Sequence, residues 1–376
     1  MISVTICSPG PDLAAPWQAL AARSEANIFM HPAALLAAAQ TGFARIHVLL
    51  AWDEGESPRR PVGFWALQER RALPLAPSFL DSLPYDYAFT SNAVVEEGYA
   101  DAVVSAFFEA IRRDTRLPKV VSLRSFAADT AVYQAMVRQL AAAGRHREFL
   151  RLERPFADRA NGVKASGSTR KKLRQDWNRL SGEGAVDIVN SRLSADVEAA
   201  FETFLALEAA SWKGEQGTAL LCDADDARFV RELMRGLAAE NQASVALLRV
   251  GGTAVAAQVL LFSGTQTYTW KTAYDRSFAR FSPGALLVDK LTESLLAAGA
   301  VTAIDSCSAA DGFMAQLWTG RRTMVDALLD VRSRHSLAFV VESARRQGFE
   351  QLRAVRNRMR RAIKGSGRAV TARKAS

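Results

Sequence analysis

The sequence contains few of the residues that build disulfide frameworks or metal sites. Its 376 residues include three cysteines, Cys7, Cys222 and Cys307, and four histidines. The cysteines are widely separated and odd in number, which gives neither a disulfide framework nor a paired-cysteine metal motif. The histidines are scattered and form no HExxH pattern. We therefore expect no metal site, and a buried packing role is favoured for Cys307 over that of a nucleophile.

Long apolar runs are also missing. No stretch approaches the roughly 20 consecutive apolar residues that a membrane-spanning helix needs. Residues 1–13 lack the basic start and the apolar core of a secretory signal peptide. A hydrophobic content of 49% with 23% charged residues is ordinary for a folded globular protein. We therefore expect a cytoplasmic protein.

The net positive charge of the chain comes from its C-terminal end. The formal net charge is +9, but residues 332–376 contain 13 Lys or Arg and 2 Glu, which leaves about −2 for residues 1–331. A near-neutral body does not favour DNA binding. The tail reads as a helix with Leu352, Val355, Met359 and Ile363 apolar and Arg353, Arg356, Arg360 and Arg361 basic. It suits either packing against the body or weak, peripheral contact with the anionic inner membrane surface.

The length of the chain predicts more than one domain. Residues 154–168 are rich in Gly, Ser, Pro and charge, and they interrupt both the helical and the strand periodicity. We place a boundary there. The prediction is a first domain over 1–155, a second domain over 156–331 and a basic helical tail over 332–376.

The second domain is predicted to begin with a helix and to continue as a meander. Residues 168–180 have the spacing of one helical face, with Ser168 as the expected N-cap. Three β-like runs follow at 244–250, 253–262 and 265–274. Gly251-Gly252 separates the first two and is a strong hairpin signal, which predicts an antiparallel meander.

A Ser-Pro-Gly turn follows the meander. Residues 282–284 precede a helix that we expect to run to about Ala298, and the buried strand expected over 300–307 would then lie parallel to the last strand of the meander. A helix N-terminus can bind an anion, and Gly284 would let a pyrophosphate approach the amides of residues 284–286. The tripeptide is equally compatible with an ordinary helix start.

This order of elements resembles the acyl-CoA N-acyltransferase (GNAT) fold. The segment WKTAYDRSFARFSPGALLVDKL (270–291) is similar to its BioF2-like, cellulose-biosynthesis-associated branch, which is related to the Fem aminoacyl transferases. Residues 166–180 and 204–214 fit the same family, and the first 155 residues resemble its degenerate N-terminal half. The resemblance implies an α/β (mixed α+β) fold of tandem GNAT-like domains, each a mixed, mostly antiparallel sheet flanked by helices.

Two segments depart from the family pattern. Only Ser282, Pro283 and Gly284 occupy the place of the glycine-richer phosphate turn. The segment after Asp305 lacks the glycine-rich, Tyr- and Lys-bearing stretch of many relatives.

The resemblance also implies an activity. It predicts direct transfer of an acyl group from acetyl-CoA or a longer acyl-CoA, used as cosubstrate without a permanently bound cofactor, to an amine. The acceptor class is a small molecule or a sugar or polysaccharide precursor, and we expect its specificity to depend on loops over 73–90 and 213–226. The alternatives are a Fem-like transferase that uses aminoacyl-tRNA, and a non-catalytic binding or scaffold protein.

The resemblance and the local pattern together give the candidate site residues. Glu208 is the first choice for the general base, although it could equally be a solvated helix carboxylate. Asp275 and Asp305 are next, and for Asp275 the favoured alternative is that it only caps its turn. The full set is, for catalysis, Glu208, Asp275, Asp305 and Tyr274; for the cosubstrate, Lys271, Arg280, Phe281, Ser282, Gly284, Ala285 and Leu286; and for the acceptor, Trp212 and Lys213.

One further pattern suggests an anion. Arg170, Lys171 and Lys172 occupy the first turn of a predicted helix, where the macrodipole disfavours positive charge. A CoA phosphate or an anionic acceptor would hold them there, and a solvated basic face is the alternative.

Overall fold

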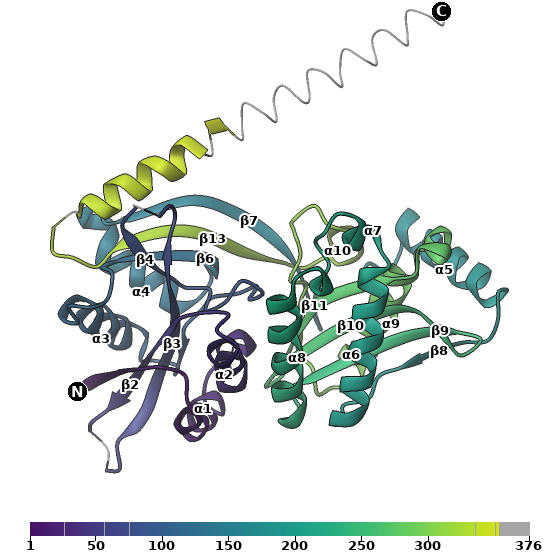
Figure 1. The fold of residues 1–376 in the computed structure, drawn as a ribbon, viewed down its shortest axis with the longest axis horizontal. Coiled ribbons are helices and arrows are strands. Elements are labelled where there is room, and N and C mark those ends of the chain that lie inside the picture. The colour runs from purple at the N-terminus through teal and green to yellow at the C-terminus, as the bar shows by residue number, and fades with distance from the viewer. Residues whose placement is uncertain (26, 56, 75, 335, 350, 353–376) are drawn as a thin grey trace, which may run out of the picture.

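The described chain forms one continuous mixed β-sheet with helices against its faces, and β7 joins its two parts, which we call the first sheet and the second sheet (Figure 1). The computed structural model describes residues 1–352 except 26, 56, 75, 335 and 350. The first sheet contains β1 (Ile2–Cys7), β2 (Ile46–Asp53), β3 (Arg60–Arg71), β4 (Ser78–Asp81), β5 (Val94–Val95), β6 (Val120–Ala127), β7 (His146–Asp158) and β13 (Arg321–Asp330). Its helices are η1 (Pro11–Leu13), α1 (Ala14–Ala21), η2 (Ile28–Met30), α2 (Pro32–Gln40), α3 (Ala100–Arg113), α4 (Ala131–Leu140) and η3 (Ala141–Ala143).

The second sheet is built around the meander. Its strands are β8 (Val186–Val189), β9 (Ala243–Val250), β10 (Thr253–Ser263), β11 (Gln266–Tyr274) and β12 (Ala303–Asp305), the last paired with the end of β7. Its helices are α5 (Ser168–Ser181), α6 (Ser194–Ala209), α7 (Trp212–Glu215), η4 (Leu220–Cys222), α8 (Ala224–Ala239), η5 (Arg276–Phe281), α9 (Pro283–Ala297) and α10 (Phe313–Leu317). The predicted class, mixed α/β with two mostly antiparallel sheets flanked by helices, is confirmed.

The meander and the crossover both form as predicted. Gly251 and Gly252 have φ of 56° and 82°, the left-handed conformation that the tight β9–β10 hairpin requires. β11 then passes through η5 and α9 to β12, which lies parallel to it. The helix start differs in one detail, because Gly167 rather than Ser168 is the N-cap of α5 and no side chain caps it.

The two sheets are joined through β7, and this differs from the predicted boundary. β7 pairs with β13 over most of its length and with β12 at residues 156–158, so the Gly/Ser-rich segment expected to separate the domains begins as a strand. β13 lies in the stretch assigned to the second domain, yet it pairs with β6 and β7 in the first sheet. Its Val325, Ala327 and Leu329 are buried in the large core, which holds it there.

That core runs through both halves of the molecule. Phe29 and Phe43 from the first half pack with Phe229 and Tyr268 from the second, and the rings of Phe43 and Phe229 stack with centroids 4.2 Å apart. A smaller cluster between the second sheet and α5, α9 and α10 contains Leu173, Leu287 and Trp318, among others. The shared core fixes the first domain against β11, which positions the site described below.

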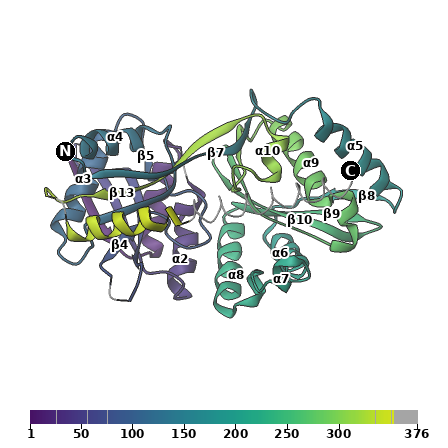
Figure 2. The same ribbon diagram turned by 90° about the horizontal axis from the view of Figure 1, so that it is seen from above.

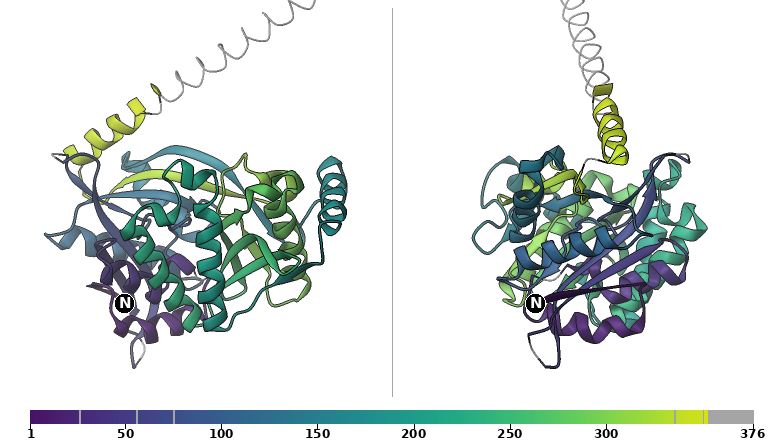
Figure 3. Two further views of the ribbon diagram at one scale, coloured as in Figure 1. Left: turned by 45° about the vertical axis from the view of Figure 1, so that its right-hand side comes forward. Right: turned by 90° about the vertical axis from the view of Figure 1, so that its left-hand side faces the viewer.

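A further helix over 337–349 follows β13 and lies across the first sheet, over β4 and β13 (Figure 2). It occupies the outer side of the molecule, as Figure 3 shows from two directions. Of the predicted tail helix, Leu352 is described, whereas Arg353, Val355, Arg356, Met359, Arg360, Arg361 and Ile363 lie outside the described residues. Within the described part of the chain, no helix is both long and apolar enough to cross a bilayer.

Candidate active site

Strands β11 and β12 separate in the middle of the second sheet. They pair only from Gln266 opposite Ala303 to Tyr268 opposite Asp305, whereas β11 continues to Tyr274. The pairing of β11 with β10 shifts register at the same place, because Thr269 and Lys271 lie opposite consecutive β10 residues and Trp270 is the extra residue of a bulge. Bulges re-aim side chains and are common beside active sites. We call the region beyond Tyr268, where β12 no longer accompanies β11, the β11–β12 opening.

The turn into α9 closes one end of this opening. Asp275 caps η5, since its Oδ1 accepts the Ser277 amide at 2.8 Å. Ser282 has a left-handed φ of 52° and its carbonyl accepts the amides of Ala285 and Leu286 at 2.9 and 3.1 Å. These two amides, expected as phosphate donors, are therefore already bonded within the turn. Their role in phosphate binding stays a prediction.

Gly284 is required for packing. A Cβ at this position would lie 3.2 Å from Thr272 Cγ2 and 3.5 Å from Tyr274 Cδ1. Gly284 is buried, so its missing side chain allows α9 to lie directly against β11. Tyr274, one of the predicted catalytic residues, is half-buried beside it.

The basic first turn of α5 has protein carboxylates as partners. Arg170 is bonded to Asp289 and Glu293, both on α9. Lys172 pairs with Asp176, and its Nζ donates to Ser282 Oγ at 2.8 Å. The proposed bound anion is therefore not needed to hold Arg170 there, and α5 is brought against the Ser-Pro-Gly turn.

Arg280 and Phe281, the other predicted residues of the turn, contact α5 and the segment that directly follows it. Arg280 pairs with Glu183 at 3.0 Å. Phe281 is buried, with the guanidinium groups of Arg179 and Arg280 at 5.4 and 4.6 Å from its ring centroid. Phe281 thus anchors the turn through its core contacts, and the exposed Arg280 beside it stays a candidate for the cosubstrate.

An ionisable cluster lies beside β11 where the two domains meet. Glu208 on α6 is only 1% exposed, and its Oε1 accepts Lys213 Nζ at 2.8 Å while its Oε2 accepts the Leu220 amide at 3.0 Å. Both oxygens of the predicted base are therefore engaged in holding the segment that follows α6. Lys271 on β11 lies with its Nζ 4.7 Å from the Tyr87 ring centroid.

Burial lowers the pKa of Lys271 to about 8, with a further lowering by Lys213 and opposing contributions from Glu208 and Asp226. Desolvation disfavours the ammonium form, because its hydration shell is lost and no carboxylate is bonded directly to it in the described contacts. A lysine with this pKa is partly neutral near physiological pH and can accept a proton.

The two loops expected to shape the acceptor site meet in this cluster. Tyr87 donates its hydroxyl to Asp226, and its own carbonyl accepts Trp270 Nε1 at 2.9 Å. Burial, followed by this bond to Asp226, raises the pKa of Tyr87, so it stays a hydrogen-bond donor. Trp212, predicted to contact the acceptor, is 45% exposed at the start of α7.

Asp305 lies on the other strand of the opening. It is 1% exposed, its Oδ1 accepts the Cys307 amide at 2.8 Å, and the Arg154 guanidinium lies 3.5 Å away. Burial raises the pKa of the Cys307 thiol far above its ordinary value, so this thiol remains protonated. Asp305 is thus tied to β7 through Arg154.

A cavity of about 730 Å³ opens at the other end of β11. Tyr268 from β11 and Arg322 from β13 line it together with residues of the first domain. The lining includes four carboxylates, Glu25, Glu96, Glu97 and Asp129, and two guanidinium groups, Arg23 and Arg322. Arg322 pairs with Glu25 at 2.9 Å and with Asp129 at 3.3 Å, and Arg23 pairs with Glu96 at 3.1 Å. Negative charge is therefore in excess.

The strand opening, the turn and the following helix lie in a part of the chain that is similar to a known domain type. Residues 167–315 match the family model described as an acetyltransferase (GNAT) domain. No curated protein matches the sequence. Two solved structures are similar over most of their length. FemX is 10% identical, with a TM-score of 0.56, and the similarity covers 86% of this chain and 96% of FemX. L-PGS from Bacillus licheniformis is 15% identical, with a TM-score of 0.53, and the similarity covers 88% of this chain and 94% of L-PGS. At these identities the likeness is one of fold.

Within the matched residues 167–315, the structure brings some of the predicted residues together and separates others. Tyr274, Ser282 and Gly284 meet at the turn, whereas Glu208, Lys213 and Lys271 gather on the side of β11 that faces the first domain. Tyr87 and Asp226 were not named individually, but they lie in the two loops, 73–90 and 213–226, that were expected to shape acceptor specificity. Arg322 had no role in the sequence-based prediction, and no local pattern marks it.

Proposed function

We propose that this protein is an N-acyltransferase that transfers an acyl group from an acyl-CoA thioester directly to an amine. The observation that carries the proposal is the β11–β12 opening, which leads from the half-buried Lys271 to the turn before α9 within the matched residues. Beyond Tyr268 one edge of β11 has no strand partner among the described residues. A donor lying along that edge would find backbone amides for its carbonyl.

Lys271 is our proposed proton acceptor. In the reaction the amine nitrogen attacks the thioester carbonyl, a C–N bond forms and the C–S bond breaks, and CoA leaves as its thiol. The amine must lose one proton, which neutral Lys271 can accept and then pass to the departing CoA sulfur. Glu208 would then act as a positioning residue, because both of its oxygens hold the segment that carries Lys213.

We propose an amine-bearing, cationic acceptor. The excess of carboxylates in the 730 Å³ cavity favours a positive ligand. Tyr268, which lines this cavity, precedes Lys271 by three residues on β11, so the two positions lie within about 10 Å along the strand. An acceptor held in the cavity could therefore extend its amine toward Lys271.

Donor binding tests the proposal most directly. We expect isothermal titration of the purified protein with acetyl-CoA and longer acyl-CoAs to give saturable heat for at least one of them. The Gly284→Val variant should weaken that heat, because its side chain would push α9 away from β11. Leu193→Ser, at an exposed residue outside the expected acceptor loops, is the matched control. No heat above dilution for any acyl-CoA would refute acyl-CoA dependence.

Aminoacyl-tRNA is the second candidate donor. The fold similarity to FemX and the resemblance of residues 270–291 to the branch related to Fem aminoacyl transferases favour it. Against it stands the near-neutral charge of residues 1–331. We expect a variant ending at Val331 to be poorly retained on immobilised tRNA; strong, salt-dependent retention of that variant would favour aminoacyl-tRNA instead.

A further inference from the structure

The helix over 337–349 turns its charged side toward the protein. Glu342 is 7% exposed and pairs with Arg345 and Arg346, each at 2.7 Å. Arg346 donates to Ser122 Oγ at 2.8 Å and lies 5.6 Å from the ring centroids of Phe79 and Phe149. Phe339 completes the inner side by packing with Phe79 on β4. The helix is thus attached through a buried ion pair and aromatic contacts.

Its apolar side faces outward. Leu337, Val340 and Val341 are 76%, 54% and 43% exposed, and Leu352, which is also helical, is 70% exposed. Leu337, Val341 and Leu352 follow one another at spacings of four and eleven residues, so they lie along one face of the helix. The residues between them on that face, Ala344 and Gly348, are uncharged. We call Leu337, Val340, Val341 and Leu352 the outer stripe.

This arrangement is the reverse of the usual one. A surface helix that only packs on its own domain buries its apolar face and exposes its charges. Here the apolar face of the helix over 337–349 is left to solvent. An exposed apolar stripe of this length indicates a binding surface.

The charge of the following segment identifies the partner. Residues 353–376 contain nine Lys or Arg and no Asp or Glu, whereas residues 1–331 carry about −2. The outer stripe and the basic charge therefore adjoin at the same end of the chain. A second copy bound through the stripe would bring two such segments together against their mutual repulsion. A nucleic acid would satisfy the charge and leave the stripe exposed.

We propose that the outer stripe binds an anionic lipid bilayer. The stripe would enter the boundary between headgroups and acyl chains, and the positive charge that follows it in the sequence would favour anionic headgroups. The acetyltransferase domain would then work at a membrane surface. This proposal does not depend on the identity of the acyl donor.

Vesicle sedimentation of the full chain tests it. The probes are phosphatidylcholine vesicles with and without about one third phosphatidylglycerol. We expect the bound fraction to be at least about tenfold larger on the anionic vesicles and to fall as salt is added. The triple variant Leu337→Ser, Val341→Ser, Leu352→Ser should lose about tenfold in affinity, because it removes apolar contact without changing charge.

The control variant is Leu193→Ser, since Leu193 is 71% exposed in the second domain. It should bind as the unmodified chain does. Equal binding to both vesicle types would overturn the proposal, and so would full binding by the triple variant, which would indicate charge alone. A dimer in light scattering that the triple variant abolishes, without a change in vesicle binding, would assign the stripe to a second copy instead.

Discussion

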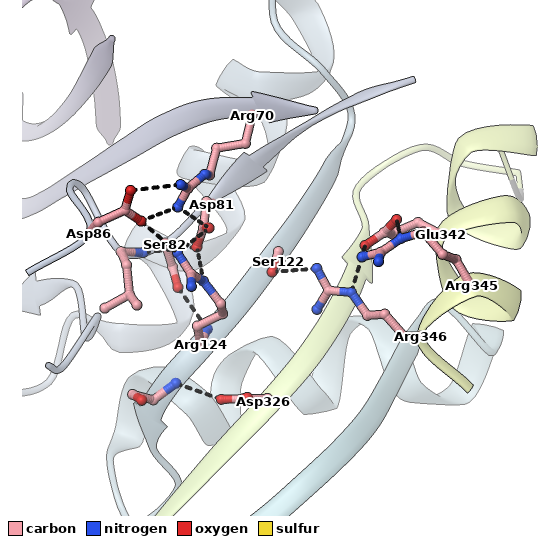
Figure 4. Close-up of polar contacts among 12 residues, drawn as sticks. Arg70, Asp81, Ser82, Asp86, Ser122, Arg124, Asp326, Glu342, Arg345 and Arg346 are labelled. Carbon is pink, nitrogen blue, oxygen red and sulfur yellow. Dashed lines mark hydrogen bonds and ion pairs between the residues drawn. The ribbon is translucent and has the colours of Figure 1, made fainter. Parts of the chain in front are cut away.

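Each domain contains one pair of parallel strands connected by a helix, and the two pairs differ at the point where the strands separate. In the first domain β4 and β6 pair at Leu80 opposite Val121 and at Asp81 opposite Ser122. Arg124 on β6 then reaches back to Asp81 with bonds of 2.6 and 3.0 Å (Figure 4). The two strands of the first domain are therefore bridged by an ion pair directly after they part.

More charges complete this network. Arg70 holds Asp86 with bonds of 2.6 and 2.9 Å, and Asp326 on β13 accepts the Ser125 amide at 2.7 Å. Figure 4 also shows Arg346 of the helix over 337–349 bonded to Ser122. In the second domain the corresponding region holds Lys271 with a lowered pKa. The same topology thus holds an ion-pair network in the first domain and a lysine with a lowered pKa in the second. The difference lies in the side chains that follow the paired residues.

The largest expected effect is on activity, which should depend on Lys271 at the β11–β12 opening and not on Arg124, where β4 and β6 part. Lys271→Met should lower kcat/KM for acyl transfer by about 10²- to 10⁴-fold, because the proton acceptor is lost, with little change in stability. Steady-state release of CoA thiol measures this. Arg124→Met, where β4 and β6 part, is the matched control, and the activity per folded molecule of this variant should be unchanged. A Lys271→Met protein that keeps full activity would remove Lys271 from the mechanism.

The second prediction concerns the stability that the ion-pair network around Asp81 gives to the first domain. Asp81→Ala should lower the free energy of unfolding by about 3 kcal/mol, because Asp81 is 1% exposed and its removal leaves Arg124 and Arg70 without their buried partner. Urea unfolding measures the loss. Asp101→Ala, which breaks only the exposed pair with Arg138, should cost less than about 1 kcal/mol. Similar losses for both variants would mean that the network contributes little.

The third prediction concerns the pH dependence of kcat/KM, which should follow the titration of Lys271. The pKa of Lys271 is lowered from 10.5 to about 8, so the ammonium form dominates below pH 8 and the neutral form above it. We expect kcat/KM to rise about tenfold per pH unit up to about pH 8 and then to level off. The profile of Lys271→Met should lack this inflection. An unchanged inflection in that variant would assign it to another group.

The smallest effect concerns the helix that covers the first domain. Arg346→Met should lower the free energy of unfolding by about 1 kcal/mol, because it removes the bonds to Glu342 and Ser122 and keeps much of the contact with Phe79. Thermal unfolding measures the change, and acyl transfer should be unaffected. A loss of activity would show that the two domains are coupled through this helix.

Much of the fold could be predicted because its signals are local. Gly251-Gly252 predicts a hairpin since few other residues accept two consecutive left-handed conformations, and Pro283 with Gly299 marks both ends of α9. The candidate site was predicted in part. Lys271 and Ser282 were named from a motif, whereas the partners of Lys271, Tyr87 and Asp226, come from distant segments that no spacing relates to it.

The sequence by itself determined the meander of the second domain with its parallel crossover, and the location of the net positive charge in residues 332–376. Only the tertiary structure decided that β13 pairs with the first sheet, that Arg170 is held by Asp289 and Glu293, and that the helix over 337–349 shows its apolar side to solvent. The physical reason is the range of the interactions. Backbone conformation depends on neighbouring residues, whereas strand partners, desolvation and ion pairs depend on which distant surfaces the shared core brings into contact.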